Sequence, residues 1–419
     1  MTAEHVLFDA VVFDLDGTLA ATERYWVAAA ARGAQRAFEE LGLERAPPSA
    51  AEWMAMVGSP LEQAFERVFS DLTKQQRARV MALCVEEEHA ALAAGGAAPM
   101  PGAFEVLREL RARGVKIAIA SNCSAQYLEA LLDGLSDGGD SLRSFVDQAR
   151  CLQSPRVRDK GDMIRDLLES FGTRSAVMVG DRSSDAEAAH ANALAHIHVA
   201  SGFASADERV ECEATLQGLD QLLAALGSRA RWIGAALERV DARTLGVSGR
   251  PASGKSLFAR DAARVLSARG VAARVISLDA FLRESPNERA ASDDHLERAF
   301  DLDSLLRSVL EPRRLGRATL AGPWGAAVAP DERLIVEGLF LADPRLRPAF
   351  DGLIHLAAPD ELLLRRALAR DPSGAELVRM RRDFLPAHDA FETRLPPARE
   401  ADLVLDASNS LGAPLPSRP

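Results

Sequence analysis

The chain has 419 residues, more than the roughly 100–200 that one domain usually spans, so at least two domains are expected. Hydrophobic residues make up 47% and charged residues 26%, a balance that excludes wholesale disorder, a collagen-like chain and a coiled coil. The formal net charge of −11 argues against a protein that binds nucleic acid through the phosphate backbone.

Cysteine usage and the N-terminal residues favour the cytoplasm. The 4 cysteines form no CxxC pair and are too few to staple a chain of this length. The first residues include Glu4 and Asp9 but no lysine or arginine, unlike a secretory signal peptide. No apolar run approaches the roughly 18 residues needed to span a bilayer. We therefore expect a cytoplasmic protein without a membrane partner.

Short apolar runs alternate with longer amphipathic segments along the chain. Runs rich in Val and Ile predict strands that are buried on both faces of a parallel sheet. These runs are residues 10–13, 115–120, 176–179, 244–247, 273–278 and 334–336. Amphipathic patterns at residues 104–113 and 257–268 predict helices between them. The expected fold class is therefore α/β.

Two departures from this alternation divide the chain. Residues 22–98 carry almost no strand signal and predict a helical insert between the first two strands. The second break is Gly227-Ser228-Arg229, after which residues 230–243 form either a linker helix or the first helix of a second domain. We predict a first domain at 1–226, a second at 227–407 and a disordered tail at 408–419.

Two carboxylates, Asp14 and Asp16, follow the first predicted strand in the run Asp-Leu-Asp-Gly-Thr. In open α/β sheets, ligands bind at this end of the strands. The same residue types also suit a solvated turn or part of a calcium loop. However, no acidic residues follow at calcium-loop spacing, and the preceding strand is wholly apolar. The pair is therefore a candidate site.

Four separated motifs together resemble the haloacid dehalogenase (HAD) superfamily. They are residues 14–18, Ser121 at the end of the second predicted strand, Lys160, and residues 180–185 after the third. The resemblance covers roughly residues 1–226. It implies a HAD-type, Rossmann-like parallel sheet. It also implies that the insert is the small α-helical cap of phosphoglycolate-phosphatase-like and phosphoglucomutase-like members.

The HAD resemblance also implies a mechanism, in which Asp14 attacks phosphorus and forms an aspartyl-phosphate. Asp16 would protonate the leaving oxygen and later activate water. Ser121 and Lys160 would hold the phosphate oxygens. The Mg²⁺ ligands would be Asp14, Asp16, Asp181 and Asp185, the last either as a direct ligand or behind one. A phosphomutase is the alternative to a phosphatase.

The cap loop and two neighbouring side chains complete the expectations for this domain. Gly58-Ser59-Pro60 is either a substrate-facing loop of the cap or an ordinary turn between helices. Cys123 and His190 lie near the motifs, and we expect both to be packing residues. The cap type implies a small organophosphate substrate.

A nucleotide-binding pattern follows the strand at residues 244–247. Residues 249–256, Gly-Arg-Pro-Ala-Ser-Gly-Lys-Ser, match the Walker A motif, and an amphipathic helix follows. In this motif backbone N–H groups wrap the β-phosphate, the lysine reaches the β- and γ-phosphates, and the serine ligates Mg²⁺. The expected ATP-binding residues are Gly249, Ser253, Gly254, Lys255 and Ser256.

Further residues in the second half resemble the uridine kinase-like family of P-loop kinases. They are Asp279 in Ser-Leu-Asp-Ala-Phe, Phe300-Asp301, Glu337-Gly338 and residues 365–371. The resemblance covers roughly residues 240–410 and implies a P-loop NTPase α/β domain. It gives Asp279 the role of base toward an acceptor hydroxyl, Glu337 that of a Mg²⁺ ligand, and Arg366 and Arg370 that of stabilising the transferred phosphoryl group.

Two alternatives remain for this half. The arginine cluster could be a solvated basic face of a helix. Leu282 stands where uridine kinases carry an aromatic residue, and both tyrosines of the chain lie in the first third. The acceptor is therefore a nucleoside, a sugar or a polyol.

The sequence as a whole predicts a bifunctional enzyme. A Mg²⁺-dependent HAD phosphatase of a small phosphate ester would be fused to an ATP-dependent kinase of a small hydroxyl acceptor. In a second hypothesis the P-loop half is a nucleotide-binding module that regulates the phosphatase. The sequence leaves the oligomeric state open.

Overall fold

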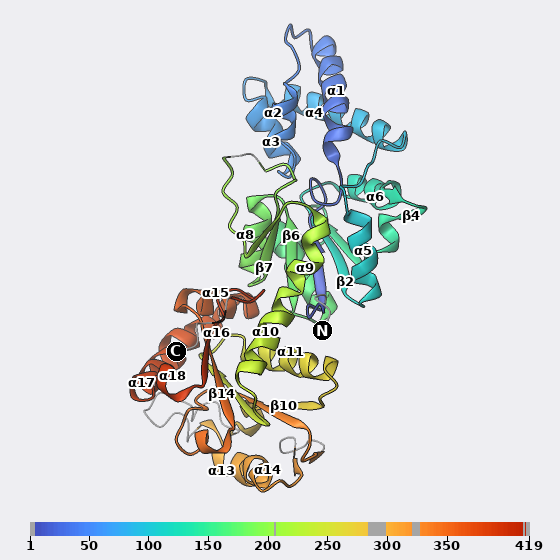
Figure 1. Cartoon of the computed structure of the whole chain (residues 1–419). Coiled ribbons are helices and arrows are strands. Elements are labelled where there is room, and N and C mark those ends of the chain that lie inside the picture. The colour runs from blue at the N-terminus through green and yellow to red at the C-terminus, as the bar shows by residue number, and fades with distance from the viewer. Residues whose placement is uncertain (1–4, 205–206, 284–298, 321–326, 414, 416–419) are drawn as a thin grey trace. The chain divides into compact units, whose positions relative to one another are not determined.

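The computed structural model describes residues 5–204, 207–283, 299–320, 327–413 and 415. The chain divides into two compact units (Figure 1). The first unit is Phe8–Ala225, and the second is Leu226–Pro419 together with Met1–Leu7. Leu7 accordingly lies in the core of the second unit, although the sequence assigned it to the first domain. Among the described residues, no helix is long and apolar enough to cross a membrane.

The first unit contains a sheet of six strands in the order β5-β2-β1-β6-β7-β8, with every neighbouring pair parallel. The strands are β1 (Ala10–Phe13), β2 (Lys116–Ser121), β5 (Gln148–Cys151), β6 (Ala176–Gly180), β7 (Ala195–Val199) and β8 (Ala214–Leu216). All four residues of β1 are buried, as expected for a strand that is covered on both faces. β1, β2 and β6 confirm the three strands predicted for this region.

Helices occupy the insert between β1 and β2 and cover the sheet. The insert holds α1 (Trp26–Leu41), α2 (Ala50–Met54), α3 (Leu61–Val68) and α4 (Lys74–Ala93), which gather into a bundle of their own (Figure 1). The other helices are α5 (Ala103–Ala112), α6 (Ala125–Gly134), α7 (Lys160–Phe171), α8 (Ser183–Ala191) and α9 (Leu222–Leu226). A short hairpin pairs β3 (Ser136–Asp137) with β4 (Asp140–Ser141).

The order of the strands explains where a ligand would bind in the first unit. The chain moves from β1 outward through β2 to β5, and then returns to β6 on the other side of β1. In open α/β sheets, the carboxyl ends of the strands at such a reversal flank a crevice that binds ligands. The residues that follow β1 and β6 therefore lie at the favoured position.

The second unit contains a sheet of five parallel strands in the order β10-β13-β9-β14-β15. They are β9 (Thr244–Gly249), β10 (Ala273–Ser277), β13 (Arg333–Glu337), β14 (Gly352–Ala357) and β15 (Leu403–Asp406). The strands predicted at residues 244–247, 273–278 and 334–336 are confirmed. The first strand, β9, is central, and the chain reverses direction across it between β13 and β14. A short antiparallel pair joins β11 (Thr319–Leu320) to β12 (Ala327–Val328).

Helices of the second unit pack on both faces of this sheet, over two apolar clusters. They are α10 (Ser228–Arg239), α11 (Lys255–Ala268), α13 (Leu302–Leu305), α14 (Glu311–Arg314), α15 (Asp360–Arg370), α16 (Ala375–Arg379), α17 (Leu385–Arg394) and α18 (Pro397–Glu400). Trp232 of α10 packs edge-to-face on Phe258 of α11, with ring centroids 5.4 Å apart. α10 is therefore the first helix of the second unit and not a free linker.

The prediction of a disordered tail is wrong for its first residues. Leu411 is 3% exposed, and its carbonyl accepts a hydrogen bond of 2.9 Å from the Ser228 hydroxyl. The Arg229 guanidinium donates to the carbonyl of Ser410 at 2.6 Å. An apolar anchor and two side-chain donors on α10 thus order a segment that is rich in Ser and Gly. Residues 414 and 416–419 lie outside the described residues.

Candidate active site

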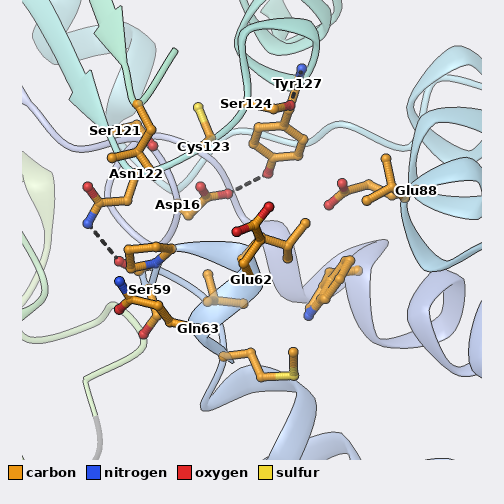
Figure 2. A pocket seen from close by; sticks show the side chains of 18 of the residues that line it. Asp16, Ser59, Glu62, Gln63, Glu88, Ser121, Asn122, Cys123, Ser124 and Tyr127 are labelled. Carbon is orange, nitrogen blue, oxygen red and sulfur yellow. Dashed lines mark hydrogen bonds between the residues drawn. The ribbon is translucent and has the colours of Figure 1, made fainter. Parts of the chain in front are cut away.

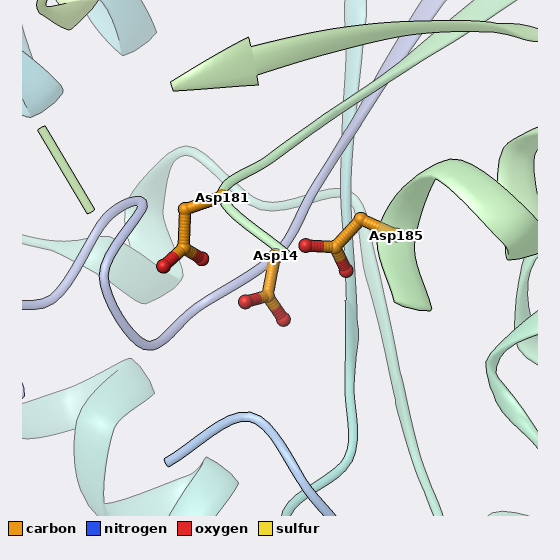
Figure 3. A group of neighbouring side chains, drawn as sticks. All are labelled: Asp14, Asp181 and Asp185. Atoms are coloured by element: carbon orange, nitrogen blue, oxygen red, sulfur yellow. The ribbon is translucent and has the colours of Figure 1, made fainter. Parts of the chain in front are cut away.

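Three buried aspartates converge at the carboxyl edge of the first sheet (Figure 3). Asp14 directly follows β1, Asp181 directly follows β6, and Asp185 lies in the first turn of α8. One carboxylate oxygen from each residue lies within 4.8 Å of the other two. Each residue is at most 1% exposed. The chain reversal in the sheet thus unites the first and fourth sequence motifs.

Lys160 is the cation of this site. Asp159 caps the N-terminus of α7, and Lys160 is the first residue of that helix. Its Nζ lies 2.7 Å from Asp14 Oδ1 and 2.6 Å from Asp185 Oδ1. Burial opposes the charge on Lys160, but the two carboxylates raise its pKa above the usual value. Lys160 therefore remains charged at the site.

Negative charge exceeds positive charge in this cluster. Burial raises the pKa of Asp14 well above its usual value, against the opposing effect of Lys160 and together with Asp185. Burial and Asp185 likewise raise the pKa of Asp181 to about 7. Asp14 Oδ2 is buried and has no hydrogen-bond partner among the described residues. Carboxylate oxygens are preferred ligands of Mg²⁺, so Asp14, Asp181 and Asp185 fit such an ion.

Small residues make room for Asp181. A Cβ atom at Gly202 would lie 2.2 Å from the Asp181 Cβ, so no larger residue fits there without displacing the aspartate. Gly17, in the turn after Asp16, has a φ of +81° and would meet Asp181 Oδ2 at 2.6 Å in the same way. The neighbouring Phe203 N–H donates to Asp181 Oδ2. The position of this carboxylate is therefore fixed by backbone on two sides.

Asp16 makes a different group of contacts, and its role as a metal ligand stays a prediction. It is not part of the cluster of three aspartates. Its Oδ1 accepts hydrogen bonds from Thr22 Oγ1 at 2.6 Å and from the Tyr127 hydroxyl. The Tyr127 hydroxyl is also hydrogen-bonded to that of Tyr25. Burial raises the pKa of Asp16, while the bonds from Thr22 and Tyr127 oppose the shift. These two bonds fix the orientation of the Asp16 carboxyl.

A cavity of about 470 Å³ lies against Asp16 and Ser121, between the sheet and the cap helices (Figure 2). Ser121 ends β2 and is 2% exposed. Residues 58–60 line the cavity, and Asn122 Nδ2 donates to the Gly58 carbonyl at 3.1 Å. The cap loop therefore faces the candidate site and is not merely a turn between helices. Cys123 also lines the cavity, and its role as a packing residue stays a prediction.

Several residues of this site escaped the sequence analysis. They are Thr22, Tyr25, Trp26, Glu62, Glu88 and Tyr127. All except Tyr127 belong to the cap insert, where no motif marks them. Tyr127 lies in the first turn of α6, directly after the loop that follows Ser121. The sequence did carry a signal for Tyr127. A helix that begins just after a strand has its first turn beside the ligand-binding edge of the sheet, so residues of that turn are candidates for the site.

In the second unit, residues 249–256 form the loop between β9 and α11. Lys255 Nζ donates to the Arg250 carbonyl of the same loop at 2.8 Å. Burial lowers the pKa of Lys255 to about 8, against the effect of Glu337 and Asp279. Ser256 Oγ donates to Glu337 Oε1 at the end of β13 at 3.1 Å. The predicted lysine, serine and glutamate thus lie at one edge of the sheet.

The loop at residues 249–256 has a backbone conformation with positive φ angles at two of its glycines. Gly249 and Gly254 have φ angles of +151° and +95°, and Gly254 is the N-cap of α11. A Cβ at Gly249 would lie 2.6 Å from the carbonyl oxygen of Leu356. Ser253 Oγ is buried without a hydrogen-bond partner among the described residues. Asp279, in the turn that follows β10, is exposed.

Helix α15 carries the predicted arginines. The Arg366 guanidinium lies 3.4 Å from the carbonyls of Ala252 and Ser253, so this side chain reaches the loop. Arg370 is ion-paired with Glu376 instead. The structure therefore brings Arg366 to the nucleotide-binding pattern through a direct contact. Arg370 pairs with Glu376 of α16, and its charge also lowers the pKa of Lys255.

Comparison with known proteins identifies a relationship for the first unit. Residues 8–192 match the family of haloacid dehalogenase-like hydrolases, and residues 160–225 match the HAD-hydrolase-like family. No protein of curated function matches the chain.

Solved structures resemble about half of the chain. CbbY from Rhodobacter sphaeroides in complex with phosphate is 22% identical, covers 51% of this chain and 96% of its own, and has a TM-score of 0.43. A predicted phosphoglycolate phosphatase from Haemophilus somnus is 18% identical, with coverages of 52% and 97% and a TM-score of 0.45. A putative phosphoglycolate phosphatase from Lactobacillus delbrueckii subsp. bulgaricus is 22% identical, with coverages of 52% and 98% and a TM-score of 0.44.

Proposed function

Because the first unit belongs to the haloacid dehalogenase-like hydrolases, we propose that it hydrolyses small phosphate monoesters with Asp14 as the nucleophile. The observation that carries the proposal is the free, buried Oδ2 of Asp14, beside Lys160 and two further aspartates at the reversal point of the sheet. An ionised carboxylate can attack phosphorus without a general base.

The neighbouring residues divide the remaining work. Lys160 holds Asp14 through Oδ1, which leaves Oδ2 to attack, and its charge faces the phosphate oxygens together with the Ser121 hydroxyl. Asp16 lies on the cavity side, where the leaving alcohol must sit. It protonates the departing oxygen and then takes a proton from the water that hydrolyses the aspartyl-phosphate. Tyr127 and Thr22 hold the Asp16 carboxyl in place during both steps.

The three-aspartate cluster would hold the magnesium ion that the family resemblance implies. Asp14, Asp181 and Asp185 would supply its protein oxygens. When bound, Mg²⁺ offsets the repulsion between the carboxylates and an incoming phosphate dianion. Burial and the neighbouring carboxylates raise the pKa values of Asp14 and Asp181, so the site without a metal disfavours their charged forms. Chelation should therefore abolish turnover.

Replacing Asp14 by asparagine tests this proposal. The amide preserves the shape but removes the nucleophile, so phosphate release from p-nitrophenyl phosphate should fall by about 10⁴-fold or more. Asp140→Asn, on an exposed hairpin of the same unit, is the matched control and should keep normal activity. Normal turnover by Asp14→Asn would disprove the assignment. A phosphomutase would instead require a phosphorylated activator and would release phosphate only slowly.

For the second unit we propose ATP binding at residues 249–256 and transfer of phosphate to a small hydroxyl compound. The contact that favours this function is the hydrogen bond between Ser256 and Glu337, because serine and an acidic strand-end residue jointly hold Mg²⁺ in P-loop enzymes. The charge of Asp279 opposes the lowering of the Lys255 pKa, which supports Asp279 as a base close to the phosphate-binding lysine. Arg366 would neutralise charge on the transferred group.

Nucleotide titration separates the kinase from a regulatory module. Lys255→Ala should abolish the binding of a fluorescent ATP analogue and all ATP consumption, while p-nitrophenyl phosphate hydrolysis persists. Asp14→Asn is the reciprocal control, because it should bind and consume ATP normally. A kinase consumes ATP only with a hydroxyl acceptor, so a panel of nucleosides, sugars and polyols is needed. If ATP binds, no acceptor is phosphorylated and the phosphatase rate changes, the regulatory hypothesis holds.

A further inference from the structure

The half of the active-site cavity that faces the cap is acidic. Glu62 of α3 and Glu88 of α4 point into it, opposite Asp16 (Figure 2). None of the described residues that line the cavity is a lysine, an arginine or a histidine. Arg182 contacts the cap loop at the Val57 carbonyl, but it is not among the lining residues and is ion-paired with Glu208 at 2.9 Å. A leaving group in this space therefore meets carboxylates and no cation.

Glu88 is buried and has no partner among the described residues. It is 9% exposed, and none of its contacts is a hydrogen bond or an ion pair. Its neighbours on α4, Glu86 and Glu87, are both paired with Arg36. Burial, with a further effect of Asp16, raises the pKa of Glu88 to about 8. Neither of its oxygens is among the buried atoms that lack a partner, because the carboxyl faces the cavity. The carboxyl is therefore accessible to a hydrogen-bond donor of a ligand in the cavity.

The remaining walls of the cap half suit an alkyl chain with a cationic end. They are formed by Trp26, Met56, Val57, Leu61, Met81 and Val85. An indole ring and thioether groups accommodate an ammonium group together with its methylenes, because the ring face attracts cations and Met adapts its shape. An anionic end group would instead face the Glu88 carboxyl and the exposed Glu62 carboxylate, and like charges repel.

We propose that the first unit acts on phosphate monoesters of amino alcohols, whose protonated amine is bound by Glu88 and Glu62. This substrate class rests on the proposed phosphatase function. The phosphate lies at Asp14, Lys160 and Ser121, and the alkyl chain crosses the cavity toward the cap. The amine then donates to Glu88, which ionises because a cation has arrived. Hydrolysis releases the amino alcohol and inorganic phosphate.

A matched series of substrates tests the proposal in the full-length chain with Mg²⁺. Alkyl phosphates that end in an amine, a hydroxyl or a carboxylate are compared at chain lengths of two to five carbons, and p-nitrophenyl phosphate reports basal phosphatase activity. A charge-assisted hydrogen bond corresponds to about a tenfold to hundredfold effect. We therefore expect kcat/KM for the best amine to exceed that of the matching alcohol by at least tenfold, and the carboxylate to be poorest.

Variants on one helix identify the residue responsible. Glu88→Gln keeps the size of the side chain but removes its charge, so the preference for amine over alcohol should fall toward one, mainly through KM. Glu86→Gln, exposed on the same helix, is the control and should keep the full preference. Equal or better turnover of the alcohol or carboxylate series, or a preference unchanged by Glu88→Gln, would overturn the proposal. If the parent chain hydrolyses neither the alkyl phosphates nor p-nitrophenyl phosphate, the phosphatase function itself is refuted.

Discussion

Replacing Asp181 by asparagine should stabilise the metal-free first unit although it destroys the metal site. Asp181 is fully buried, and burial together with Asp185 raises its pKa to about 7. The unfolded chain restores an ordinary aspartate with a pKa near 3.9. At pH 8 the native state therefore holds a charge that it disfavours. Asparagine removes this charge and can still accept the hydrogen bond from the Phe203 N–H.

The size of the effect follows from the pKa difference. A shift of about 3 pKa units corresponds to about 4 kcal/mol at a pH above the folded pKa, by linkage between protonation and unfolding. The native state binds the extra proton between pH 4 and 7, so the stability of the parent chain should fall as the pH rises through this window. Below pH 4 the aspartate is protonated in both the native and the unfolded state, so the stabilisation by Asp181→Asn should vanish. For a unit of this size, about 4 kcal/mol raises Tm by about 10 °C.

Differential scanning calorimetry of the full chain in EDTA measures the prediction. The transition that is left in place by Asp261→Asn, a variant of the second unit, belongs to the first unit, so the two units can be distinguished. At pH 8 this transition should rise by about 10 °C in Asp181→Asn. Addition of Mg²⁺ should stabilise the parent chain and leave the variant almost unchanged. The difference in Tm between the two proteins should therefore become smaller. Asp140→Asn again serves as the control, because its carboxylate is exposed.

Two results would show the reasoning to be faulty. The first is a variant that is no more stable than the parent in EDTA at pH 8, since the native state would then not disfavour the charge on Asp181. The second is a gain of equal size at pH 4, because a packing effect of the amide would not depend on protonation.

Two further predictions concern packing. Gly33→Ala would place a Cβ 2.5 Å from the Cys84 Cα where α1 crosses α4, so the free energy of unfolding in urea should fall by about 1–3 kcal/mol and KM should rise. The control Gly134→Ala, whose Cβ would meet open space on α6, should be neutral or slightly stabilising. Equal effects of both variants would contradict the packing argument. Asp261→Asn breaks a buried ion pair in which Arg229 Nε lies 2.7 Å from Asp261 Oδ2. The free energy of unfolding of the second unit should fall by about 3–5 kcal/mol in calorimetry, while the transition of the first unit stays in place. An unchanged transition of the second unit would mean that the pair is energetically neutral.

The sequence predicted those parts of the fold whose signals are local. β1 is four apolar residues followed by Asp14, and β9 is followed by a glycine-rich loop, so strand and function could be located together. β7 and β14 escaped because His196 and His198 interrupt the first and His355 the second. Burial keeps His196 and His355 neutral by lowering their pKa values to about 4, which a residue type alone does not reveal.

The substrate half of the site was not predictable, because it is assembled from distant helices of the cap. Glu62 and Glu88 lie on α3 and α4, and in the sequence each is one acidic residue among many helical ones. Glu87 pairs with Arg32 and Arg36 of α1, whereas Glu88 pairs with no arginine in the part of the chain that the structure describes. This difference depends on how α1 packs against α4. The residues at the strand ends form short sequence motifs that can be recognised, whereas the shape and charge of the cavity depend on tertiary packing.

The placement of Leu7 has a consequence for how the protein is made. Leu7 is 1% exposed in a core that otherwise contains residues between Ala230 and Ala407. On the ribosome it emerges before any residue of the first unit, yet its partners follow more than two hundred codons later. The first unit can fold as soon as it is released, since domains usually fold as units during synthesis. Leu7 cannot be buried in this core before those partners have been synthesised. Replacing Leu7 by a polar residue would thus affect the unit that is encoded last, although Leu7 itself precedes the first unit in the chain.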